Sequence, residues 1–210
     1  MLDLEHPQIY LTTPRDFELA KFSDQLAHIL DSSDIACLRL AMNTLDEIEI
    51  GKTADRLRDI CHAREVPLVI ESHIVMVERL GLDGVHLCDG PRSVRKAREI
   101  LGKEPIVGSF CGISKHDGMS ASESGADYVS FGPVQGATLG DGRIAEIDLF
   151  AWWTEMIEVP VVAEGGLSLE NFAKLRKVAD FIALQDEIWR SESPMARLQA
   201  FLAKLTPDAQ

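Results

Sequence analysis

The chain alternates eight times between short apolar runs and longer amphipathic segments, and this alternation limits the fold more than any other feature. The short runs have the length and composition of buried strands, and the longer segments have the apolar spacing of helices with a charged face. The predicted strands cover residues 8–12, 35–40, 68–71, 84–87, 106–109, 128–131, 161–163 and 181–184. The predicted helices cover residues 16–30, 45–65, 73–80, 93–101, 115–124, 147–157, 169–178 and 195–204.

The predicted strands are apolar on both faces, as in Val-Pro-Leu-Val-Ile at 66–70 and Val-Pro-Val-Val-Ala at 159–163. Strands of this kind belong to parallel sheets whose two faces are covered. Eight strand–helix units in 210 residues predict one (β/α)₈ barrel domain over 1–210, close to the minimal length of about 200 residues. A doubly wound open sheet is the alternative. It normally has a glycine-rich turn after its first strand, where this chain reads Thr13-Pro14-Arg15-Asp16.

Net charge and composition exclude several classes of partner. With 21 basic and 34 acidic residues the formal net charge is −13, which argues against nucleic acid because its phosphodiester backbone would be repelled. No apolar run is long enough for a membrane span. The first seven residues lack a secretory signal, so we expect a cytoplasmic protein whose four separated cysteines are free thiols. The pair Trp152-Trp153 is expected in the core or at the subunit contact of a homodimer.

Functional groups of a (β/α)₈ barrel come from the carboxyl ends of its strands and the loops that follow them. His86 is a candidate acid or base because histidine titrates near neutral pH; the alternative is a core histidine. Glu71 and Glu164 either serve function or pair with Arg39 or another cation, because an inward carboxylate without a partner is costly. The catalytic candidates are Arg39, His86 and Glu71. The substrate-binding candidates are Thr12, Ser109, Gly132, Glu164, Gly165, Gly166 and Gln185.

Three stretches of sequence carry a resemblance to a known family. They are Asp-Gly-Val-His-Leu at 83–87, Gly-Ala-Asp-Tyr-Val-Ser-Phe-Gly-Pro-Val at 125–134 and Val-Pro-Val-Val-Ala-Glu-Gly-Gly-Leu at 159–167. Together they resemble the thiamine phosphate synthase family and its thiazole tautomerase (TenI-like) relatives, in order from about residue 9 to residue 188. The resemblance implies a transferase of thiamine biosynthesis that joins hydroxymethylpyrimidine pyrophosphate to thiazole phosphate and releases pyrophosphate with the help of Mg²⁺.

The resemblance also implies roles for single residues. Arg39 would bind an anionic ligand, Glu71 and Asp89 would bind Mg²⁺, and Gly165 with Gly166 would bind phosphate through backbone N–H groups. Small-molecule thiamine precursors would be the partners.

The chain departs from the family pattern at several of these positions. Ala41 stands where the family has a lysine, Ser72 and Pro91 stand where it has metal-binding aspartates, and Glu164 replaces an apolar residue. After the eighth predicted strand, residues 185–187 (Gln-Asp-Glu) replace a small neutral turn, and acids at such a position also favour the start of a helix. The pattern therefore predicts a degenerate pyrophosphate and magnesium site.

Two other functions remain open on the same barrel. One is a metal-independent thiazole tautomerase or isomerase in which His86, Glu71 or Glu164 exchanges protons. The other is a non-catalytic protein that binds a thiamine-like ligand in an acidic barrel mouth.

Overall fold

The computed structural model describes residues 6–136 and 139–205, and within them eight parallel strands form a closed barrel. Each strand pairs with the next in the sequence, and β1 pairs with β8. The strands are β1 (Gln8–Thr12), β2 (Cys37–Leu40), β3 (Leu68–Glu71), β4 (Gly84–Leu87), β5 (Ile106–Phe110), β6 (Tyr128–Phe131), β7 (Val161–Glu164) and β8 (Phe181–Leu184). Closure confirms the predicted (β/α)₈ barrel, and the open-sheet alternative is wrong.

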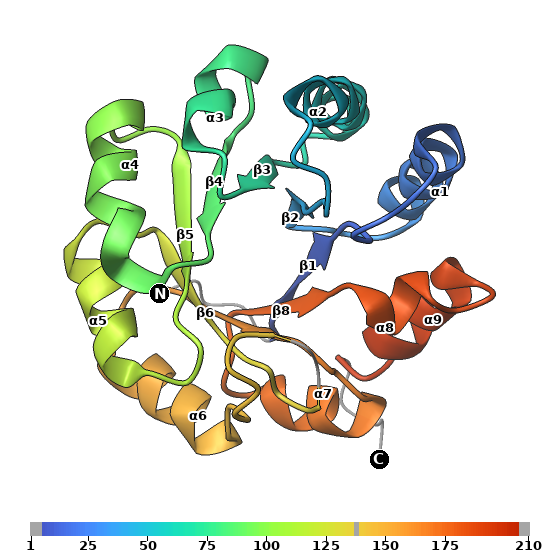
Figure 1. Cartoon of the computed structure of the whole chain (residues 1–210). Coiled ribbons are helices and arrows are strands. Elements are labelled where there is room, and N and C mark those ends of the chain that lie inside the picture. The colour runs from blue at the N-terminus through green and yellow to red at the C-terminus, as the bar shows by residue number, and fades with distance from the viewer. Residues whose placement is uncertain (1–5, 137–138, 206–210) are drawn as a thin grey trace.

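Helices surround the ring of strands (Figure 1). They are α1 (Leu19–Ser32), α2 (Glu47–His62), α3 (Ile74–Leu80), α4 (Val94–Leu101), α5 (Lys115–Glu123), α6 (Ile147–Met156), α7 (Leu169–Leu175), α8 (Asp186–Trp189) and α9 (Pro194–Leu202). The 3₁₀ helix Gly90–Ser93 was not predicted, and of the short helix α8 only the start, at the acids 186–187, was expected. Helix α1 begins later than predicted because the carboxylate of Glu18 accepts hydrogen bonds from the N–H groups of Ala20 and Lys21 and so caps the helix.

Two apolar layers form the core. The larger lies between strands and helices, and the smaller fills the barrel interior with Tyr10, Cys37, Val69, Tyr128, Val162 and Ala183. Gly108 makes room for the Tyr128 ring, since a Cβ there would lie 2.0 Å from a ring carbon. The Tyr128 hydroxyl lies 2.9 Å from the Tyr10 hydroxyl and 2.8 Å from Nδ1 of His86. The side chains of Tyr10, Tyr128 and His86 therefore form a hydrogen-bonded cluster inside the barrel.

The tryptophan pair divides between the core and the surface. Trp153 is fully buried and its Nε1–H donates to the carbonyl of Val159 at 2.8 Å, whereas the half-buried Trp152 stacks under the ammonium group of Lys115 at 4.1 Å. The homodimer stays a prediction.

Within the described residues, no helix has the length and apolar character that crossing a membrane requires.

Candidate functional site

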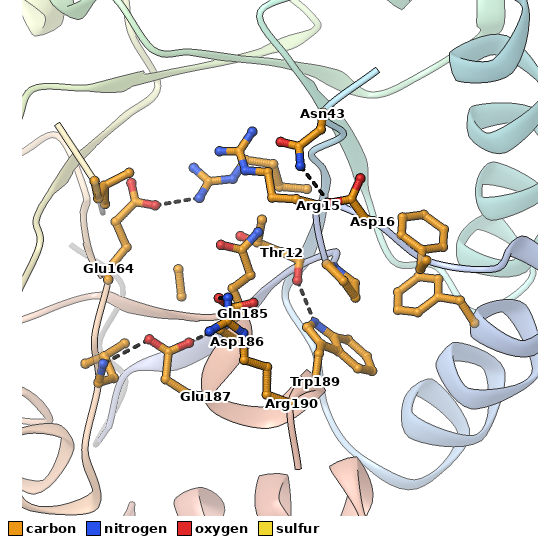
Figure 2. A pocket seen from close by; sticks show the side chains of 18 of the residues that line it. Thr12, Arg15, Asp16, Asn43, Glu164, Gln185, Asp186, Glu187, Trp189 and Arg190 are labelled. Atoms are coloured by element: carbon orange, nitrogen blue, oxygen red, sulfur yellow. Dashed lines mark hydrogen bonds and ion pairs between the residues drawn. The ribbon is translucent and has the colours of Figure 1, made fainter. Parts of the chain in front are cut away.

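A cavity of about 1160 Å³ opens at the carboxyl ends of β1, β2, β7 and β8, and we call it the main cavity. The loop after β1 and the first turns of α1 form one wall, and the loops after β7 and β8 form the opposite wall (Figure 2). The sequence-predicted residues that line it are Thr12, Arg39, Glu164, Gly165, Gly166 and Gln185. The barrel thus gathers in one cavity residues that are up to 173 positions apart in the chain.

Arg39 and Glu164 form a buried ion pair between β2 and β7. Nη2 of Arg39 lies 2.5 Å from Oε2 of Glu164, and the two side chains are only 7% and 5% exposed. Burial, the largest single influence, would raise the pKa of Glu164, but the opposing contributions, led by the charge of Arg39, together lower this pKa to about 2. Both groups are therefore charged at neutral pH, and each compensates the other.

Three buried polar atoms of residues that line the main cavity lack a hydrogen-bond partner among the described residues: the Thr12 hydroxyl, Nε of Arg39 and Oε1 of Glu164. Within the described residues, neither the hydroxyl of Thr12 nor Nε of Arg39 makes a hydrogen bond, although both atoms are buried. Thr12 and Arg39 are register partners across β1 and β2, and both line the main cavity. A buried polar group that stays unpaired costs about 1–3 kcal/mol. The floor of the main cavity therefore holds two unused donors, on Thr12 and Arg39, and one unused acceptor, on Glu164.

His86 is closed inside the barrel and does not line the main cavity. Its side chain is 1% exposed, Nδ1 contacts the Tyr128 hydroxyl, and Nε2 lies 3.9 Å from Oε1 of Glu164. Burial and then the charge of Arg39 lower the pKa of His86 well below its usual value. The imidazole is therefore neutral, and it connects the ion pair to the tyrosines of the barrel interior.

Glu71 is held by Arg15, a residue that the sequence did not single out for function. The Arg15 guanidinium donates to both carboxylate oxygens of Glu71, at 2.6 and 3.0 Å, and the Cys88 thiol lies 3.0 Å from Oε1. Burial and the charge of Glu71 raise the pKa of Cys88 to about 12, so it stays a thiol. Arg15 lines both the main cavity and a second cavity of about 370 Å³ that contains Glu71.

Three other predicted residues lie outside both cavities. Exposed Asp89 accepts a hydrogen bond from the Ser93 hydroxyl at 2.6 Å. The buried Ser109 donates to the carbonyl of Gly90 at 2.9 Å. Gly132 packs against β7, because a Cβ at this position would lie 2.3 Å from the Glu164 carbonyl oxygen. These three residues therefore contact neighbouring parts of the chain and do not line either cavity.

The donors predicted for Mg²⁺ do not form a magnesium site in this arrangement. Protein sites for Mg²⁺ use one or two carboxylates together with substrate phosphates. Both oxygens of Glu71 are already bound by Arg15, and Asp89 does not share a cavity with Glu71. Across residues 6–136 and 139–205, His, Cys, Asp and Glu side chains form no group of three that would hold a metal ion. We therefore assign no chemical step to a metal.

The loops after β7 and β8 are joined by a carboxylate. Gly165 and Gly166 have φ of 85° and 74°, and a Cβ at Gly166 would lie 1.9 Å from the Gln135 carbonyl oxygen, so glycine is required there. Oε1 of Glu187 accepts from the N–H of Leu167 at 2.9 Å, and Oε2 accepts from the N–H of Gln185 at 2.7 Å. Figure 2 shows this carboxylate between its two donors.

Helix α8 and the residue before it are hydrogen-bonded to the end of β1, next to β8. Nε1–H of Trp189 donates to the carbonyl of Thr12 at 2.7 Å, and the side-chain amide of Gln185 donates to the carbonyl of Thr13 at 2.7 Å. Gln185 is therefore a wall residue of the main cavity whose amide is used to hold the loop after β1.

Comparison with known proteins places the chain in a family. The family model described as thiamine monophosphate synthase matches residues 9–188. A thiamine-phosphate synthase of Rhodospirillum centenum is 36% identical over 184 residues, covering 87% of this chain and 89% of that protein. Another, of Erythrobacter litoralis, is 34% identical over 212 residues, covering 98% and 99%.

A solved structure supports the fold. Thiamine phosphate pyrophosphorylase from Pyrococcus furiosus superposes with a TM-score of 0.80 at 20% sequence identity, and the match covers 95% of this chain and 97% of that one. The family match runs from the second residue of β1 to the end of β8 and beyond, so it includes the strands that carry the main cavity. The chain therefore belongs to the thiamine monophosphate synthase family.

Proposed function

We propose that this protein transfers a hydroxymethylpyrimidine group from its pyrophosphate to the ring nitrogen of a thiazole, which is the reaction of thiamine phosphate synthase. The observation that carries the proposal is that Thr12 and Arg39 lie side by side on β1 and β2 in the lining of the main cavity, each with a buried donor that has no partner among the described residues. Family membership and the names of the relatives support the same reaction.

In the proposed reaction the bond between the pyrimidine methylene carbon and the pyrophosphate oxygen breaks, and the oxygen keeps the electron pair. The thiazole nitrogen then forms a bond to that carbon, so the ring becomes a thiazolium. Negative charge grows on the departing oxygen, and positioned donors stabilise such charge. Arg39 and Thr12 would supply the donors in this chain. Arg15 also lines the cavity, but its guanidinium is bound to the carboxylate of Glu71.

The two other functions receive less support from the geometry. A tautomerase that uses His86 would need this imidazole to reach the ligand, yet His86 is buried and outside the cavity lining. Glu164 lines the cavity but is held by Arg39, which stabilises its ionised form. The experiment below distinguishes the proposed enzyme from a protein that binds its ligand without catalysis.

The test supplies purified protein with hydroxymethylpyrimidine pyrophosphate and either thiazole phosphate or the unphosphorylated thiazole alcohol. Chromatography measures thiamine phosphate or thiamine, with and without Mg²⁺ and beside an active synthase. We expect product with at least one thiazole. Thr12→Val keeps the side-chain shape but removes the donor, so we expect kcat/KM to fall about a hundredfold, as for other single-donor removals.

Thr53→Val, a buried change in α2 away from the main cavity, serves as the matched control and should leave kcat/KM within about threefold. Absence of product with both thiazoles, while the control synthase is active, would contradict the proposal. Stabilisation by thiamine in a thermal-shift assay without turnover would then support the binding protein. Equal activity of Thr12→Val and wild type would exclude the role of Thr12.

A further inference from the structure

The carboxylate of Glu187 lies where the loops after β7 and β8 present backbone N–H groups to the main cavity. One oxygen accepts from Leu167 in the loop after β7, and the other accepts from Gln185 in the loop after β8. Glu187, Leu167 and Gln185 all line the main cavity, together with Gly165 and Gly166. A single half-buried side chain thus joins the two loops and uses one donor from each.

This pair of loops is where (β/α)₈ barrels commonly bind a phosphate. Consecutive backbone N–H groups in a glycine turn form a concave anion site, and Gly165 and Gly166 have the positive φ that such a turn needs. A phosphate that entered here would compete with Glu187 for the N–H groups of Leu167 and Gln185. Both are already bound to an anion that belongs to the chain itself.

Helix capping accounts for one of the two hydrogen bonds that Glu187 accepts. The bond from Glu187 to the N–H of Gln185 joins residues two positions apart at the start of α8, and acids are common at helix starts. The bond to Leu167 crosses to a loop 20 residues away and has no part in capping α8. The neighbouring Asp186 shows that an acid at this helix start need not enter the loops, because it pairs with Arg190.

We propose that Glu187 is a specificity-determining residue that occupies the phosphate position, so that the main cavity selects a thiazole bearing a free hydroxyl over the corresponding phosphate ester. The proposal rests on the proposed function, because the thiazole is the acceptor of that transfer. Each carboxylate oxygen of Glu187 accepts one N–H and retains capacity for a hydroxyl donor, which an alcohol has and a phosphate dianion lacks.

Charge repulsion acts in the same direction as hydrogen bonding. A phosphate charge about 4 Å from a carboxylate, at an effective dielectric near 20, is disfavoured by roughly a thousandfold in affinity. Because Glu187 is half-buried and partly screened by solvent, we expect a smaller effect, roughly tenfold to a hundredfold.

The experiment measures dissociation constants by isothermal titration calorimetry for thiazole phosphate and for thiazole alcohol. Wild type should bind the alcohol at least about tenfold more tightly than the phosphate. Glu187→Ala frees both N–H groups and should bind the phosphate at least about tenfold more tightly than wild type does. Glu170→Ala removes an exposed carboxylate of α7 that does not line the main cavity, and it should change both affinities less than about threefold.

Glu187→Gln removes the charge and keeps one acceptor. It replaces Glu187→Ala in the experiment if circular dichroism shows that Glu187→Ala does not fold. Glu187→Gln should also gain phosphate affinity. The inference is overturned if wild type binds the phosphate at least as tightly as the alcohol. It is likewise overturned if both Glu187 variants fold and neither gains phosphate affinity. Binding of neither thiazole overturns both proposals, whereas binding with the expected preference but no transfer overturns the proposed function alone.

Discussion

At the scale of single residues, the buried pair of Arg39 and Glu164 decides the electrostatics of the barrel mouth. Either charge alone would be strongly unfavourable there, because removing one partner of a buried pair typically costs about 3–5 kcal/mol. Together they keep a guanidinium beside the main cavity while a carboxylate offsets most of its charge. Sequence reasoning named Arg39 in one of its two alternatives for Glu164, since an inward carboxylate needs a cation.

The pair predicts a specific acid sensitivity. The pKa of Glu164 falls from its ordinary value of 4.5 to about 2 on folding, so between these values the unfolded chain binds the extra proton. The stabilisation is therefore complete above about pH 4.5 and is lost as pH falls toward about 2, with a slope near 1.4 kcal/mol per pH unit. Urea unfolding followed by fluorescence at a series of pH values measures it.

Glu164→Gln is the matched control for this acid sensitivity. It should be about 3 kcal/mol less stable at neutral pH because Arg39 loses its partner. The difference in the free energy of unfolding between wild type and Glu164→Gln should then decrease as the pH falls through the same range. Parallel curves at every pH would show that Glu164 is not held ionised by Arg39.

At the scale of elements, three aspartates in the loops before even-numbered strands tie those strands to their neighbours. The carboxylates of Asp83, Asp127 and Asp180 accept the backbone N–H groups of Leu68, Val107 and Val161, at 2.7, 2.7 and 2.8 Å. Each bond joins the start of one strand to the start of the preceding one. The tethers lie at the amino ends of the strands, which in this fold serve stability.

We expect Asp180→Ala to destabilise the fold without changing the main cavity. The change leaves the N–H of Val161 without its carboxylate partner, which typically costs about 1–3 kcal/mol. Chemical denaturation should show this loss, while ligand affinities stay within about threefold of wild type. Glu158→Ala, a substitution at a nearby exposed acid, should change stability by less than about 0.5 kcal/mol. Equal effects of the two substitutions would argue against the tether.

At the scale of the whole molecule, the net charge of −13 is expected to destabilise the compact state through repulsion among acids. Screening weakens this repulsion, because the Debye length falls from about 30 Å at 0.01 M salt to about 8 Å at 0.15 M. We expect the Tm in calorimetry to rise by roughly 2 °C or more over this range. The double substitution Glu155→Lys and Glu158→Lys, at exposed acids, should reduce the rise. A Tm that falls with salt would mean that stabilising ion pairs dominate.

The alternation of strands and helices was predictable from sequence because it follows from local chemistry. A parallel strand covered on both faces must be apolar on both faces, and an outer helix must have one apolar stripe, so each element is encoded within its own residues. Short elements were predicted less completely: the acids 186–187 indicated the start of α8, but four residues carry too little periodicity to show where the helix ends. The strand ends that carry Thr12, Arg39, Glu164 and Gln185 followed from the same pattern.

By itself the sequence determined the barrel, its family and the strand ends at which the functional side chains lie. Only the tertiary structure decided which charges meet there: Arg15 binds Glu71, Arg39 binds Glu164, and Glu187 joins the loops after β7 and β8. The physical reason is that barrel closure brings together residues far apart in the chain, as with the 125 positions between Arg39 and Glu164. A contact between side chains that are far apart in the sequence produces no local periodicity, so it cannot be predicted from a sequence pattern.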